Sequence, residues 1–104
     1  MTRREWLTYD DFAGREGERF DASAGGPTVV PLVLTEAVES SLPGGSGPQG
    51  QQRRQFDLVF RGPAAPVHPQ GTYLVTHADL GELELFLVPL SQDDDGVRYQ
   101  AAFA

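Results

Sequence analysis

The strict alternation of polar and apolar residues at 82–85, Glu-Leu-Glu-Leu, is the feature that most constrains how this chain can fold. Successive side chains of a β-strand point to opposite faces, so the alternation predicts a strand with one buried face and one solvated face. The strand-like residues 72–77 precede it, and the segment 78–81 between the two is short enough for a tight turn. The region therefore predicts an antiparallel hairpin.

The same two-residue period recurs along the chain. Further strands are expected at residues 18–22, 28–38, 55–61 and 97–103, and one short helix is expected at residues 8–12. Pro31 falls inside one of these strands and lacks a backbone N–H, so that point is expected at a sheet edge or bulge. About six strands with short connections and no helix–strand alternation predict an all-β fold, either a small antiparallel barrel or a sandwich.

A chain of 104 residues has room for one hydrophobic core, so residues 1–104 are expected to form a single β domain. Residues 42–52 are rich in glycine and proline and predict a flexible loop between two strands.

The charge balance is acidic: the formal net charge is −7, and the chain has arginines but no lysine. An acidic surface opposes binding to nucleic acid and to anionic membranes, so neither is an expected partner. The absence of cysteine excludes disulfides and thiolate metal sites. The sequence shows no secretory signal pattern and no apolar run of about 20 residues, so we expect a cytoplasmic protein or a component of a particle assembled in the cytoplasm.

His77 and Asp79 could begin a metal site, with His68 as a third ligand. The favoured interpretation is that His77 hydrogen-bonds backbone groups where its strand ends. Glu82 and Glu84 have a spacing that suits a hydrolase, but strand glutamates without a cleft are typical of a solvated surface.

The three consecutive aspartates at 93–95 lack the alternate spacing of a calcium loop and predict a hairpin turn. No catalytic residue, metal or cofactor is therefore predicted, and the protein is expected not to be an enzyme.

Two other sets of residues suggest binding. Phe86 and Val88 continue the outward face of the glutamate-bearing strand. We expect them to be covered either by the N-terminal helix or by a partner chain, which could be another protein or a second copy of this chain. Arg53 and Arg54 are candidates to contact a partner's carboxylates.

The leading hypothesis is a structural or protein–protein interaction module. The alternative is a barrel that binds a small ligand or carbohydrate at a mouth lined by Trp6, Tyr73, His77 and Tyr99.

Several segments together resemble a small uncharacterised bacterial domain family. They are FDLVFRGP at 56–63, PQGTY at 69–73, LFLVP at 85–89 and Arg98-Tyr99, and the resemblance extends from about residue 8 to residue 103. It implies no catalytic residues. It does imply a frequent association with phage-tail-like proteins, and hence an accessory role in a phage-tail-like or contractile particle.

Overall fold

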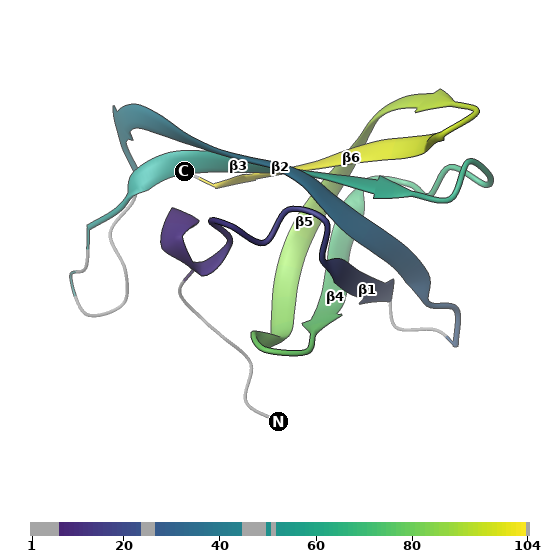
Figure 1. Cartoon of the computed structure of the whole chain (residues 1–104), viewed down its shortest axis with the longest axis horizontal. Helices are drawn as coiled ribbons and strands as arrows, with labels where there is room; N and C mark the ends of the chain where they lie inside the picture. The colour runs from purple at the N-terminus through teal and green to yellow at the C-terminus, as the bar shows by residue number, and fades with distance from the viewer. Residues whose placement is uncertain (1–6, 24–26, 45–49, 51, 104) are drawn as a thin grey trace.

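The computed structural model describes residues 7–23, 27–44, 50 and 52–103. In this part of the chain, six antiparallel strands form one sheet that closes on itself as a barrel (Figure 1). A single 3₁₀ turn, η1 (Tyr9–Asp11), precedes the strands. The strands are β1 (Arg19–Ser23), β2 (Val30–Pro43), β3 (Arg54–Gly62), β4 (Gly71–His77), β5 (Gly81–Asp93) and β6 (Gly96–Phe103).

The order around the barrel is β1-β2-β3-β6-β5-β4, and β1 pairs with both β2 and β4. Closure therefore depends on the shortest strand, which joins β4 through three residue pairs. The predicted all-β fold is confirmed, and of the two architectures left open the structure selects the barrel. A closed barrel pairs strand edges that a sandwich would leave open to solvent.

The alternation read from the sequence sets which side chains fill the barrel. Leu83, Leu85 and Leu87 of β5 point inward, and Phe56, Leu58 and Phe60 of β3 do the same. All six are at most 2% exposed, so the apolar positions of both alternating segments lie in the core. Burial of large apolar side chains of this kind stabilises a small domain by about 1.5–3 kcal/mol each.

The N-terminal segment closes one end of the barrel. The Asp11 carboxylate accepts a hydrogen bond from the Thr8 backbone N–H at 2.9 Å, which fixes the start of η1. The turn directs Phe12 inward, where it is fully buried and packs on Phe20, Phe56 and Phe103 at ring-centroid distances of 6.0–6.4 Å. The short helix predicted at 8–12 is thus present as a 3₁₀ turn, and Trp6 lies outside the described residues.

Two strands are longer than the sequence indicates. β2 continues to Pro43 because β3 lies beside it, with Glu39 opposite Phe56 and Pro43 opposite Arg54. β5 continues to Asp93 as the partner of β6. The predicted loop at 42–52 therefore loses its first two residues to β2, and most of its remainder lies outside the described residues. Irregularities in register fall at 34–36, 39–43 and 89–91. Pro31 pairs with Asp21 of β1 and has no β3 partner, because the β2–β3 pairing begins at Val33.

Candidate functional site

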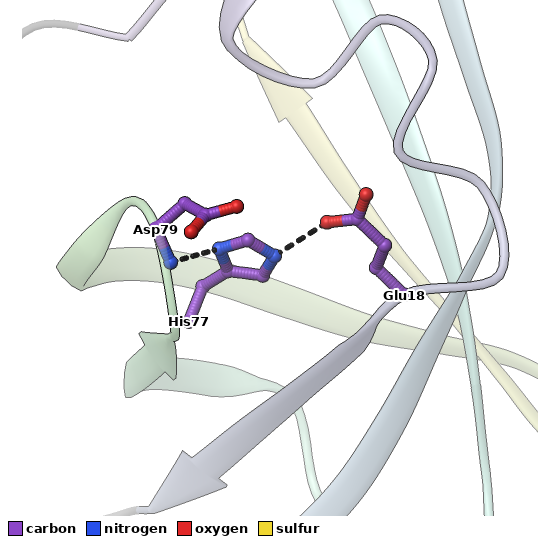
Figure 2. Close-up of side chains that lie close together, drawn as sticks. All are labelled: Glu18, His77 and Asp79. Atoms are coloured by element: carbon purple, nitrogen blue, oxygen red, sulfur yellow. Dashed lines mark hydrogen bonds and ion pairs between the residues drawn. The ribbon is translucent and has the colours of Figure 1, made fainter.

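One cluster in the described residues has the composition of a metal site. Glu18 precedes β1, His77 ends β4, and Asp79 lies in the β4–β5 turn (Figure 2). Their ligand atoms all lie within 4.8 Å of one another. His77 is 5% exposed, whereas the two carboxylates are open to solvent. Closure of the barrel brings Glu18 to His77 across 59 residues of sequence.

The hydrogen bonds of the imidazole oppose metal binding. The backbone N–H groups of Asp79 and Leu80 both donate to His77 Nδ1, at 3.0 and 3.1 Å. This assigns the proton of the neutral ring to Nε2, which donates to Glu18 Oε1 at 2.7 Å. A metal that binds Nε2 would have to displace that proton. If the proton moved to Nδ1, it would point at the two backbone N–H groups that donate to this nitrogen. The expected role of His77 as a cap of the strand end is confirmed.

Arg15 completes the cluster as a cation. Its guanidinium donates to Glu18 at 3.2 Å and to Asp79 at 3.1 Å. The hydrogen bond from His77 lowers the pKa of Glu18; burial opposes this shift and Arg15 adds to it. The bonds to Glu18 and Asp79 raise the pKa of Arg15. The four side chains therefore act as a structural clasp that ties the segment before β1 to the β4–β5 turn.

Of the residues proposed to line a ligand mouth, Tyr73 and Tyr99 lie together, His77 lies apart from them, and Trp6 falls outside the described residues. Tyr73 and Tyr99 lie near the connection between β3 and β4, where Tyr73 donates to the Pro69 carbonyl and Tyr99 accepts the His68 N–H at 3.0 Å. His77 lies four residues further along β4, in the clasp. Burial, with a contribution from Tyr99, raises the pKa of Tyr73.

The space left beside these two tyrosines is about 10 Å³, which is about the volume that one water molecule needs. His68 lines this space and does not belong to the cluster of Glu18, His77 and Asp79.

Arg53 and Arg54 have different surroundings. Arg53 lies over the stacked rings of Phe56 and Phe103, 5.6 Å from each centroid, and it donates to the Leu7 carbonyl. It thus holds the N-terminal segment on the barrel. Arg54 is exposed beside an open hollow of about 430 Å³ at the end of β2 and β3.

The aspartates at 93–95 lie where β5 turns into β6. The Asp93 carboxylate accepts the Asp95 N–H at 2.9 Å, and Gly96 follows with a φ of 142°. The predicted hairpin turn is confirmed. Glu82 and Glu84 point outward from β5 opposite Thr76 and Leu74, as expected for strand glutamates on the solvated face.

The outer surface of β5 carries an exposed aromatic residue. Phe86 is 54% exposed, and Val88 beside it on the same face is half-buried. The prediction that the N-terminal helix covers them is wrong, because Phe12 draws that segment into the barrel end. A covering partner chain remains a prediction.

Strand register continues this outward face across three strands. Gln100 of β6 lies between Val88 of β5 and Val59 of β3. In the same ladders, Arg61 lies opposite Arg98 and Asp57 lies opposite Ala102. We name these outward positions the docking face: Asp57, Val59, Arg61, Phe86, Val88, Arg98, Gln100 and Ala102.

Arg61 and Arg98 are the unusual feature of the docking face. They are direct cross-strand neighbours and both are exposed. None of the ion pairs formed among the described residues includes either of them. Like charges placed directly opposite each other destabilise a sheet, so this pair weakens the isolated barrel.

Sequence reasoning missed Arg61 and Arg98 as a pair, and it also missed Arg15 and Glu18. Outward alternation marked Arg61 as exposed, but only the pairing of β3 with β6 makes it a neighbour of Arg98. Arg15 lies in an irregular segment that carries no periodic signal.

The fold and surface define a small closed antiparallel β-barrel in which Phe12 fills one end, a structural histidine clasp joins two segments, and the outer face exposes an aromatic residue and two neighbouring arginines. The chain belongs to a family described as a domain of unknown function (DUF6916), whose model matches residues 7–103. Comparisons with curated proteins and with solved structures found no match. In the described part of the chain, no helix is long and apolar enough to cross a membrane.

Proposed function

We propose that this barrel is a non-catalytic protein–protein interaction module that binds through its docking face. The observation that carries the proposal is Phe86, a large aromatic side chain more than half exposed on a rigid strand. Exposed apolar surface of this kind marks sites of association in folded proteins. Aromatic residues and arginines are also the types enriched at protein interfaces, and both occur here.

The remaining chemistry of the described residues supports a binding role over a catalytic one. Within the histidine–carboxylate cluster, the imidazole nitrogens and the carboxylates already bond to one another, to Arg15 and to the backbone. The tyrosines of the alternative ligand site bond to the chain's own backbone and leave about 10 Å³ of space. The resemblance to companions of phage-tail-like proteins adds the proposal that the module acts within such a particle, assembled in the cytoplasm.

Photocrosslinking in the native host tests the proposal. The probe is benzoylphenylalanine, a photoreactive amino acid, placed at position 86. The matched control places it at Val67, which is 43% exposed in the connection between β3 and β4. The expected result is a light-dependent covalent adduct from position 86 and none from position 67. If position 86 gives no protein adduct, or if both positions give the same adducts, the docking face is not an interface.

A further inference from the structure

We infer that the occupant of the docking face is a second copy of this chain, packed face to face with β3 antiparallel to its counterpart. The inference rests on the proposed function and adds the identity of the partner. It follows from the arrangement of charges on β3, where Asp57 and Arg61 are placed symmetrically about Val59.

The spacing of these residues is set by the strand. Outward positions recur every two residues, about 6.6 Å apart, so the acid and the base lie on either side of Val59 and about 13 Å from each other. At that distance they form no ion pair within one chain. When a second copy faces the first with its β3 reversed, each Arg61 lies opposite the Asp57 of the other chain. A twofold interface requires this reciprocity, in which residue i meets j and j meets i.

The second arginine and the apolar residues fit the same arrangement. Arg98 is the cross-strand neighbour of Arg61, so it approaches the same Asp57 of the facing chain from the adjacent strand. One row across β3, β6 and β5 contains Val59, Gln100 and Val88. In this arrangement each of them lies near the same residue of the facing chain. A parallel arrangement would place arginine against arginine, and the charges therefore select the antiparallel one.

Dimer formation also removes two unfavourable features of the isolated barrel, namely exposed apolar side chains and two arginines that lie side by side. Phe86 and Val88 lose solvent contact, and the cross-strand arginine pair gains the Asp57 carboxylate of the facing chain. Packed sheets tolerate a rotation of about 30° between their strand directions, which the long arginine side chains can span.

Sedimentation equilibrium of the full chain, with charge reversal, tests the inference. Wild-type protein is expected to approach twice its mass of 11.3 kDa as its concentration rises, with weaker association at high salt. Arg61→Asp and Asp57→Arg each place like charges in contact at two symmetric points, so each is expected to raise the dimer Kd at least about tenfold. The double variant exchanges the two charges and is expected to return the Kd to within about threefold of wild type.

The matched control is Arg19→Asp, which makes the same charge change at an exposed site of β1, off the docking face, and is expected to leave the Kd unchanged. Because the two swapped residues are too far apart to pair within one chain, rescue by the double variant must arise between chains. A wild-type chain that stays monomeric at all concentrations, or a double variant that fails to recover, overturns the inference.

A second measurement covers the case in which a charge variant folds poorly. The chain has no cysteine, so Gln100→Cys introduces a single thiol near the twofold axis. A short bismaleimide is expected to crosslink Gln100→Cys into dimers and to leave an Arg19→Cys control monomeric. Equal crosslinking of the two variants contradicts the arrangement. The photocrosslink from position 86 distinguishes the two proposals. If the adducts contain a different protein and no second copy of this chain, the proposed interaction module is supported and the proposed dimer is overturned.

Discussion

Replacing His77 by phenylalanine tests whether the clasp stabilises the barrel through hydrogen bonds or only through ring packing. The imidazole is 5% exposed and packs on Phe20 with 4.4 Å between ring centroids, a contact that phenylalanine retains. What the variant loses is the acceptor at Nδ1 for the Asp79 and Leu80 N–H groups, and the Nε2–H donor to Glu18. A hydrogen bond contributes a net of about 0.5–1.5 kcal/mol, and more when the donor is left buried.

The two backbone bonds together give an expected loss of about 2 kcal/mol in the free energy of unfolding. A domain of this size has a net stability of about 5–15 kcal/mol, so the loss is readily measured. Urea denaturation followed by far-UV circular dichroism gives the difference at constant m-value, and the melting temperature is expected to fall by about 10 °C.

His68→Phe is the matched control. It makes the same change at a half-buried histidine whose backbone N–H, which the substitution keeps, bonds to Tyr99, and its expected effect is below about 0.5 kcal/mol. If His77→Phe is as stable as wild type, the bonds at Nδ1 contribute nothing and the clasp is only a packing contact.

Three further predictions concern Glu18 of the clasp, Gly96 in the turn between β5 and β6, and Phe12, which fills one end of the barrel. Because the folded-state pKa of Glu18 is lowered, its contribution to stability is present above the unfolded pKa near 4.5 and is lost as pH falls through the folded pKa. Glu18→Gln should therefore reduce the loss of stability on acidification in thermal melts between pH 7 and pH 3, and an unchanged pH profile would contradict this. Gly96→Ala should destabilise the barrel by about 1–3 kcal/mol. The reason is that the φ of Gly96 is 142° and an added Cβ would lie 2.3 Å from the Gly62 carbonyl oxygen. A variant that unfolds at the wild-type urea midpoint would argue against that close approach. Phe12→Ala removes a fully buried ring and should cost about 3–5 kcal/mol in chemical denaturation, with Ala13→Gly, an exposed neighbour, costing far less.

The docking face and the clasp illustrate two uses of polar groups in a small barrel. In the clasp, each His77 ring nitrogen has a hydrogen-bonding partner, and the carboxylates of Glu18 and Asp79 share Arg15. On the docking face, two arginines lie side by side without a carboxylate partner among the described residues. The clasp satisfies its charges within one chain, whereas in the proposed dimer the arginine pair receives the Asp57 carboxylate of the facing chain.

Local sequence determined the strands and the side chains that fill the barrel. Alternation is a property of adjacent residues, so the sequence of residues 55–61 by itself places Phe56, Leu58 and Phe60 on one face of a strand. The turn at residues 93–96 was equally local, because aspartate and glycine favour the required backbone conformations.

Tertiary structure decided the strand ends, the barrel closure and the neighbours of each outward residue. β2 runs past its β-branched segment to Pro43 because β3 supplies paired residues there, which overrides weak local propensity. The pairing of Arg61 with Arg98, and of Glu18 with His77, depends on register and on closure through β1. A period of two residues fixes the face on which a side chain lies but not the strand beside it. The docking face therefore emerges only when β3, β6 and β5 pair, and the clasp only when β1 pairs with β4 and closes the sheet.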